Sequence, residues 1–302
     1  IMELLEIKNI KKVFQKNLAL NDVSFSIPNG SIFGLLGLSG AGKTTFIRII
    51  TQILGPDSGE IYFNGIPLKQ EKINSIGYMP EEKGLYKKMK VGEQLLYLAQ
   101  LKGMSSKDAK TQIRFWLEKL DIVSWYNKTL DELSKGMHQK VQFISTVISQ
   151  PKLLILDEPF SGLDPINANL LKQEILELNQ KGTTIIFSTH RMGDVDELCD
   201  DIALINKGQI ILSGTVKDIK NQFKENIFKA DFTGVEESEI HKHSHFIRKE
   251  DNHFLFKLAE GQSPNELLKG LISNGFEING FSEVIPTIND IFISQISKNN
   301  QI

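Results

Sequence analysis

The sequence contains a single cysteine, Cys199, and its formal net charge is only −2 over 302 residues. One cysteine excludes an internal disulfide framework and suits a reducing compartment. The near-neutral charge gives no reason to expect a nucleic-acid partner. Residues 23–42 lack charge, but Pro28 and several glycines interrupt them, so we predict no membrane span of about 20 apolar residues. No secretion signal is recognisable, and we expect a cytoplasmic protein that reaches a membrane only through a partner.

Glycine is concentrated in one segment whose pattern, G-x-x-x-x-G-K-[ST], binds phosphate in many proteins. Residues 31–36 before it form an apolar run that predicts a buried strand, and residues 44–54 after it predict a helix. Glycines let backbone N–H groups face an anion without Cβ clashes, and a helix start adds the positive end of its dipole. The residues that we expect to hold ATP phosphates are Gly37, Leu38, Ser39, Gly40, Ala41, Gly42, Lys43, Thr44 and Thr45.

Three side chains of this segment have separate predicted roles. Lys43 would reach the β- and γ-phosphates and assist catalysis, and the Thr44 hydroxyl would bind Mg²⁺. Thr45 would help to hold the α-phosphate. ATP and Mg²⁺ are therefore the expected ligands.

The order of predicted elements indicates an α/β fold with a P-loop NTPase core. Apolar runs at 153–157 and 183–189 are typical of buried parallel strands, and a helix is predicted between them at 165–180. Alternating segments near the N-terminus predict an antiparallel edge, and the helical pattern from 91 to 123 belongs to an insert of about 88–150. The predicted domains are a nucleotide-binding domain at 3–220 and a small α+β accessory domain at 221–302, with strands at 228–232, 253–258 and 277–281.

The predicted strand at 153–157 ends in two acids, Asp157 and Glu158. We expect this strand to lie directly beside the strand at 31–36, so that its end faces the phosphates. Asp157 would then hold Mg²⁺. Glu158 would polarise the attacking water as a general base.

A second short motif, Leu133-Ser134-Lys135-Gly136-Met137, lies between the phosphate loop and these acids. With the motifs in this order, the chain from about 4 to 220 resembles the nucleotide-binding subunit of an ATP-binding cassette (ABC) transporter. The resemblance implies that Ser134 and Gly136, at the start of a helix at about 136–149, meet the γ-phosphate held by a second protomer. It also implies a transmembrane permease as partner, and leaves open whether the two protomers are identical.

Lys135 and Met137 stand where the family more often has Gly and Gln. Exporter subunits similar to sodium and drug efflux ATPases carry this form, and many of them have an accessory domain after the cassette. The resemblance therefore favours an exporter. A soluble ABC ATPase acting on ribosomes or DNA is the alternative, and a non-hydrolysing regulator is a third possibility.

The same resemblance assigns four further residues. Residues 161–164 match the D-loop, so Asp164 either serves that loop or caps the predicted helix at 165–180. His190 matches the switch histidine that contacts the γ-phosphate. Phe14 either stacks on adenine or belongs to the core. Glu81 replaces the usual Q-loop glutamine; a carboxylate can still bind Mg²⁺ and accept from water, but its added charge leaves its role open.

Three signals are discounted. Residues 206–209 approach a guanine-reading motif, but Gln209 lacks the required carboxylate, and a hairpin turn at Lys207-Gly208 is the better interpretation. The alternating His241, His243 and His245 lack further metal ligands and are taken as a solvated run. Cys199 is taken as core packing. Residues 83–90 either contact a transmembrane subunit or form a solvated loop.

Overall fold

The structure is a computed structural model that describes residues 2–15, 17–81, 84–235, 237–240, 245–251, 253–259 and 261–300. The chain divides into two compact units, Ile1–Val216 and Lys217–Ile302. This division falls slightly before the predicted domain boundary at 220. The discounted His241 and His243, and Lys83 of the segment 83–90, lie outside the described residues.

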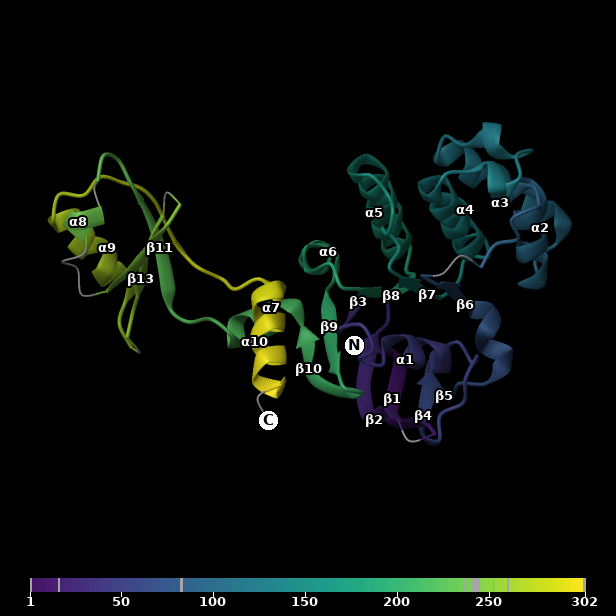
Figure 1. Ribbon diagram of the computed structural model, residues 1–302, viewed down its shortest axis with the longest axis horizontal. Helices are drawn as coiled ribbons and strands as arrows, with labels where there is room; N and C mark the ends of the chain where they lie inside the picture. The colour runs from purple at the N-terminus through teal and green to yellow at the C-terminus, as the bar shows by residue number, and fades with distance from the viewer. Residues whose placement is uncertain are drawn as a thin grey trace. The chain divides into compact units, whose positions relative to one another are not determined.

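Six strands of the N-terminal unit form a sheet in the order β10-β9-β3-β8-β7-β6 (Figure 1). Five of them run parallel, and β10 closes one edge as an antiparallel hairpin with β9. Their bounds are Ile32–Leu36 for β3, Ile76–Met79 for β6, Leu153–Asp157 for β7, Thr184–Thr189 for β8, Asp201–Asn206 for β9 and Gln209–Thr215 for β10.

The expected adjacency of β3 and β7 is wrong, because β8 lies between them and pairs with both. The crossover through a helix decides which strands become neighbours, and local sequence does not record that choice. The register still brings the strand ends to one edge: Leu36 pairs with Thr189, and Asp157 pairs with Ser188. The phosphate loop after β3 and the acids at the end of β7 therefore lie at the same edge of the sheet, as expected.

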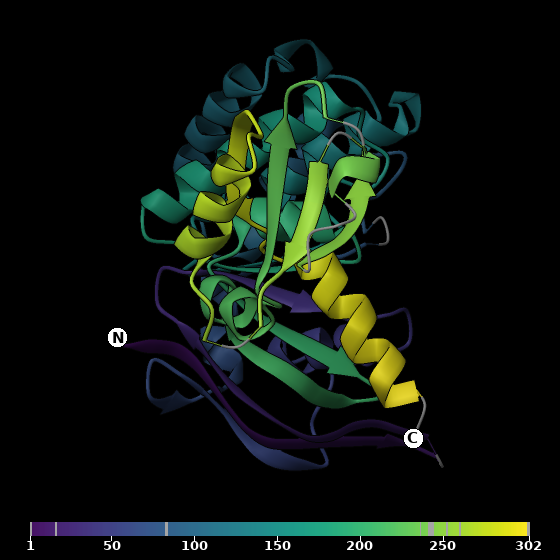
Figure 2. The same ribbon diagram turned by 90° about the vertical axis from the view of Figure 1, so that its left-hand side faces the viewer.

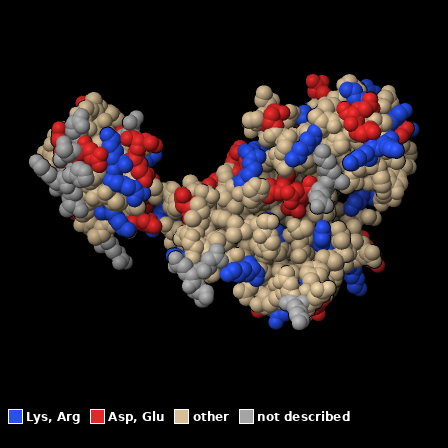
Figure 3. Space-filling view, viewed as in Figure 1, with Lys and Arg blue, Asp and Glu red and all other residues tan. Residues whose placement is uncertain are grey.

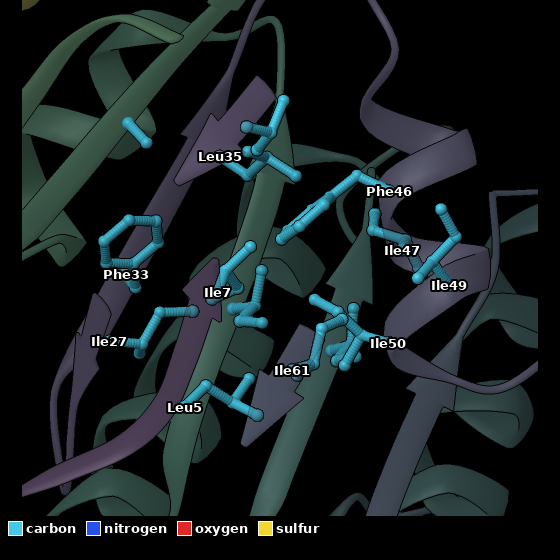
Figure 4. Packing of buried hydrophobic residues seen from close by; sticks show 14 of the residues in the cluster. Leu5, Ile7, Ile27, Phe33, Leu35, Phe46, Ile47, Ile49, Ile50 and Ile61 are labelled. Atoms are coloured by element: carbon cyan, nitrogen blue, oxygen red, sulfur yellow. The ribbon is translucent and has the colours of Figure 1, made fainter. Parts of the chain in front are cut away.

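A second, antiparallel sheet has the order β2-β1-β4-β5. Its strands are β1 (Glu3–Phe14), β2 (Asn17–Pro28), β4 (Ser58–Phe63) and β5 (Ile66–Pro67). Helix α1 (Lys43–Ile50) packs between the two sheets, with Phe46 and Ile47 facing Ile7 and Leu35 in one buried cluster (Figure 4). The start of α1 is thus fixed by a core that both sheets share.

The predicted helical pattern from 91 to 123 is divided into two helices. They are α2 (Val91–Leu101) and α3 (Ser106–Lys119), and the chain turns at Gly103, whose φ is 86°. Ser105 then caps α3 by accepting from the N–H of Asp108. The rest of the insert comprises the 3₁₀ segments Val123–Trp125 and Leu130–Glu132 and helix α4 (Lys135–Val147).

The remaining elements of this unit flank the parallel sheet. They are the 3₁₀ segment Gln70–Ser75, α5 (Pro165–Gln180) and α6 (Met192–Leu198). Cys199 directly follows α6 and is buried, in agreement with core packing, and this burial raises the pKa of its thiol. Among the residues that the structure describes, no helix combines the length and apolar character that a membrane crossing requires.

The C-terminal unit contains an antiparallel sheet in the order β12-β13-β11-β14. Helices α8 and α9 lie on one face of it (Figures 1 and 2), and Ile240, Leu267 and Leu271 join Phe228 and Phe256 in its core. The elements are α7 (Val216–Gln222), β11 (Ile227–Phe232), α8 (Glu237–Ile240), β12 (Phe246–Glu250), β13 (His253–Lys257), α9 (Pro264–Ser273), β14 (Ile278–Glu283) and α10 (Ile288–Asn300). From β11 to β14 the elements follow one another in the βαββαβ order. The helices α9 and α10 match helices that the sequence predicts near 264–274 and 287–297, whereas α7, α8 and β12 are additions to the predicted elements.

Candidate functional site

The phosphate loop connects β3 to α1 and lies against two other strands. Gly37 and Gly42 have φ values of 156° and 115°, in the region that favours glycine. A Cβ on Gly37 would lie 2.4 Å from the carbonyl oxygen of Ile205, and one on Gly42 would lie 2.8 Å from that of Ala19. The chain can therefore follow this path only with glycine at both positions.

The start of α1 is open to an anion. Gly42 occupies the capping position and has no side chain that could accept from the first helical N–H groups. Lys43 folds back, with Nζ 2.7 Å from the carbonyl oxygen of Gly37 and 3.1 Å from that of Leu38. Burial lowers the pKa of Lys43, while Asp157 and Glu158 oppose that shift. These features suit a phosphate chain.

The other residues predicted to hold the phosphates differ in exposure. The exposed ones are Leu38, Ser39, Gly40 and Thr44, whereas Thr45 is half-buried and Ala41 is buried.

The β9–β10 turn holds this loop from outside. The Gly208 N–H donates to the carbonyl of Ala41 at 2.9 Å, and the Gly208 carbonyl accepts from the N–H of Asn21 at 2.8 Å. The predicted turn at Lys207-Gly208 is confirmed, since Asn206 pairs with Gln209 around it. The segment that approaches a guanine-reading motif is therefore a structural brace.

The two acids occupy different environments at the end of β7. Asp157 is 4% exposed, and burial is the main cause that raises the pKa of its carboxyl, followed among the raising influences by Glu81. Glu158 has a left-handed backbone with φ of 50°, and its N–H donates to the carbonyl of Ser188 at 2.8 Å. Acidic side chains gather over the ends of β7 and β8 (Figure 3).

The structure brings Glu158 and His190 into contact. Oε1 of Glu158 accepts from the backbone N–H of His190 at 2.8 Å and lies 2.7 Å from Nδ1 of the same residue. Oε2 accepts from the hydroxyl of Thr189 at 3.2 Å. His190 leaves most of its side chain exposed, so its ring can meet a ligand while it contacts Glu158.

Glu81 and Phe14 both lie at the surface. Glu81 follows β6 and Pro80, and it is close enough to influence the pKa of both Lys43 and Asp157. Phe14 ends β1 and is 42% exposed, with the Lys12 ammonium 5.7 Å from its ring centroid. This exposure excludes the core interpretation of Phe14, and stacking on adenine stays a prediction.

Helix α4 begins at Lys135, one residue earlier than predicted, and Ser134 caps it. The Ser134 hydroxyl accepts from the N–H of Met137 at 3.3 Å, and the residue is exposed. A Cβ on Gly136 would lie 3.5 Å from the carbonyl oxygen of Gly162, so the predicted D-loop lies against this motif. Asp164 caps α5 by accepting from the N–H of Asn167 at 3.0 Å, which confirms its capping role; the D-loop role stays a prediction.

Two buried glutamines of α4 were not anticipated from the sequence. Nε2 of Gln139 donates to the carbonyl of Pro159 at 2.9 Å, and Nε2 of Gln142 donates to the carbonyl of Pro80 at 2.8 Å. Both are less than 5% exposed. A glutamine inside an apolar helical pattern signals a buried hydrogen bond, but the pattern alone does not identify the partner.

The donor set suits Mg²⁺ better than a metal held by protein alone. Across the described ranges, His, Cys, Asp and Glu do not form any metal-holding group of three or more. Mg²⁺ usually takes one or two protein ligands and completes its shell with water and substrate phosphates. The Asp157 carboxylate and the Thr44 hydroxyl at the start of α1 fit that arrangement.

Comparison with known proteins agrees with this geometry. Residues 20–161 match the family model described as ABC transporter, and residues 214–296 match the C-terminal domain of DrrA1-3-like ATP-binding proteins. An uncharacterized ABC transporter ATP-binding protein of Bacillus subtilis, YhaQ, is 40% identical over 97% of this chain and 98% of its own length.

Two further similarities are more distant. The linearmycin resistance ATP-binding protein LnrL of B. subtilis is 32% identical, with coverage of 78% of this chain and 77% of LnrL. A solved ATP-binding subunit of an ABC transporter superposes with a TM-score of 0.68 at 32% identity, covering 73% of this chain and 93% of that one. The chain therefore belongs to the ABC transporter ATP-binding proteins, and it is an ATP-binding ATPase of that family.

Proposed function

We propose that two copies of this cassette, or one copy and a related cassette, bind two ATP molecules between them and drive an export permease. The observation that carries the proposal is the placement of Ser134. Its hydroxyl caps α4 at an exposed position, whereas the phosphate loop and Glu158 meet at one edge of the parallel sheet. An exposed, serine-capped helix start is suited to an anion that a second protomer presents.

Hydrolysis would use the residues that the strand ends bring together. Lys43 and the N–H groups at the start of α1 would hold the phosphates, and Mg²⁺, bound by Asp157 and Thr44, would neutralise their charge. Glu158 would take the proton of the attacking water, and His190 would orient the γ-phosphate beside it. Glu81 would contact the water shell of the metal.

The partner in the membrane is inferred from the surface of the helical insert. The rings of Tyr86 and Tyr97 are both more than 40% exposed and meet edge to face at 6.3 Å between centroids. Leu101, at the end of α2, is 62% exposed. Such exposed apolar and aromatic side chains are suited to a permease segment. Export is favoured by similarity to LnrL, whose name records linearmycin resistance; the protein would then lie at the inner membrane surface.

The first test replaces Glu158 with Gln, which keeps the shape of the side chain and removes the base. We expect the rate of phosphate release to fall by roughly 10²–10⁴-fold, while an ATP-bound dimer accumulates in light scattering. Glu177→Gln is the control, because Glu177 lies on α5 and pairs with Lys119 of α3, outside the site. Wild-type turnover in Glu158→Gln would exclude the base role, and monomers alone under all ATP conditions would exclude the dimer.

The second test identifies the partner. The tagged protein should co-purify from solubilised membranes with a polypeptide that has several membrane spans. Recovery with ribosomes or DNA, and without such a polypeptide, would favour the soluble ATPase alternative.

A further inference from the structure

We propose that Gln139 is a positioning residue for Glu158, and that helix α4 couples the Ser134 motif of one ATP site to the hydrolytic end of the other site in the dimer. The coupling between sites rests on the proposed dimer, whereas the positioning of Glu158 does not. Ser134 caps α4, and Gln139 lies on the second turn of the same helix.

The backbone that follows Glu158 is held by a hydrogen-bond donor from another element. Glu158 has a left-handed backbone, which a residue with a side chain adopts only when its surroundings hold it there. Pro159 follows and has no N–H, so it cannot anchor the chain by donating a hydrogen bond. The Glu158 carbonyl accepts from the N–H of Ser161 at 3.1 Å. The chain therefore turns sharply directly after the proposed base.

Gln139 supplies the missing donor from α4. Its Nε2 lies 2.9 Å from the carbonyl oxygen of Pro159 and 3.4 Å from that of Glu158. Both acceptors are carbonyl oxygens, so the amide must present its NH₂ group to them. The side chain is 4% exposed, and in this setting a lost hydrogen bond is not replaced by bulk water. Movement of α4 thus acts directly on the backbone that carries Glu158.

Gln142 makes the corresponding contact on the other side of the site. It lies three residues further along α4, on the same face of the helix, and its Nε2 donates to the carbonyl of Pro80, the residue before Glu81. One helix therefore holds the backbone next to two predicted site residues. A phosphate bound at Ser134 would shift α4 and change the positions of both acids together.

The decisive variant is Gln139→Met, which keeps side-chain length and removes the donor. We expect kcat for ATP hydrolysis to fall about tenfold, because Glu158 loses its fixed position. KM for ATP should stay unchanged, because the phosphate loop is untouched. Combined with Glu158→Gln, the variant should still assemble an ATP-bound dimer.

Gln94→Met is the matched control. Gln94 is a fully buried glutamine of α2 in the same insert, and neither amide atom has a hydrogen-bond partner among the described residues. Its replacement should leave kcat and KM at wild-type values and should not lower the thermal unfolding midpoint.

Each outcome decides a separate point. Wild-type kcat in Gln139→Met overturns the positioning role. Equal losses of kcat and thermal stability in Gln139→Met and Gln94→Met also overturn it, since the effect would then be general damage to the insert. A reduced kcat at constant KM together with an intact trapped dimer supports both parts. If Gln139→Met reduces kcat although the wild-type protein stays monomeric, the positioning role is supported and the coupling between sites is overturned.

Discussion

Helix α1 follows Gly42, which has no side chain to cap the helix, whereas α4 follows Ser134, whose hydroxyl already accepts from the N–H of Met137. We call the first helix start the enclosed start, because its helix packs in a core that both sheets share and Lys43 contacts the phosphate loop beside it. The second is exposed, at the edge of the helical insert. Both present N–H groups and a positive dipole end to an anion. The enclosed start can bind a phosphate within one chain, and the exposed start is suited to one that another molecule brings.

The sharpest way to break this comparison is to remove the cation at the enclosed start. Lys43→Ala should weaken ATP binding to the isolated chain by about 100-fold, because charge-assisted contacts to phosphate are lost. Titration calorimetry measures this directly. Arg48→Ala, at the opposite end of α1, should leave affinity unchanged; equal losses in both variants would show that α1 had merely been destabilised.

The exposed helix start should behave in the opposite way. Ser134→Ala should leave ATP affinity of the isolated chain intact and lower turnover about tenfold, since one hydroxyl contact to the partner's phosphate is lost. It should also lower stability by about 1 kcal/mol through the lost cap.

Ser105→Ala separates these two effects. Ser105 caps α3 in the same insert, so its loss should cost a similar stability without changing turnover. If Ser105→Ala reduces turnover as much as Ser134→Ala does, the contact of Ser134 with phosphate is contradicted.

A smaller effect is expected at the adenine side of the enclosed site. Phe14→Ala should raise KM for ATP about fivefold, at the low end of what one stacked base contributes, because the exposed ring is free to stack. Steady-state assays with ATP and with ribose 5′-triphosphate, which has no base, would show whether the rise in KM depends on adenine. Val13→Ala, at the exposed neighbour, should have no effect.

The smallest effect concerns stability and pH. Burial raises the pKa of Asp157 above its ordinary value of 3.8, so the ionised carboxylate destabilises the nucleotide-free fold. The favourable contribution of its protonated form is full below that ordinary value and is lost as pH rises through the raised pKa. Asp157→Asn should therefore raise the unfolding midpoint near neutral pH, with a difference that shrinks in acid. Thermal scans across pH check this, and a difference independent of pH would contradict it.

Much of the enclosed site could be predicted from sequence because its chemistry is local. The glycines, Lys43 and Thr44 all lie within residues 37–44, and the acids end one apolar run. The hairpin at Lys207-Gly208 and the cap by Asp164 were likewise predictable from turn and capping preferences.

Contacts between distant segments were less predictable. The insertion of β8 between β3 and β7 depends on a crossover, and no residue in β7 records it. Gln139 was missed because its partner, Pro159, lies on another element and accepts through its backbone, which any residue could offer. The helix α8 and the strand β12 were missed because elements this short are too brief to show a clear hydrophobic periodicity.

The brace between Gly208, Ala41 and Asn21 joins the phosphate loop to both sheets through backbone hydrogen bonds of the protein itself. A loop tethered in this way has already lost most of its freedom before a ligand arrives, so little ordering entropy opposes capture of the triphosphate. Its amide protons should then exchange slowly with deuterium even in the empty protein. The phosphate loop would thus be preorganised for ATP, and the conformational change during the cycle would occur mainly in the helical insert.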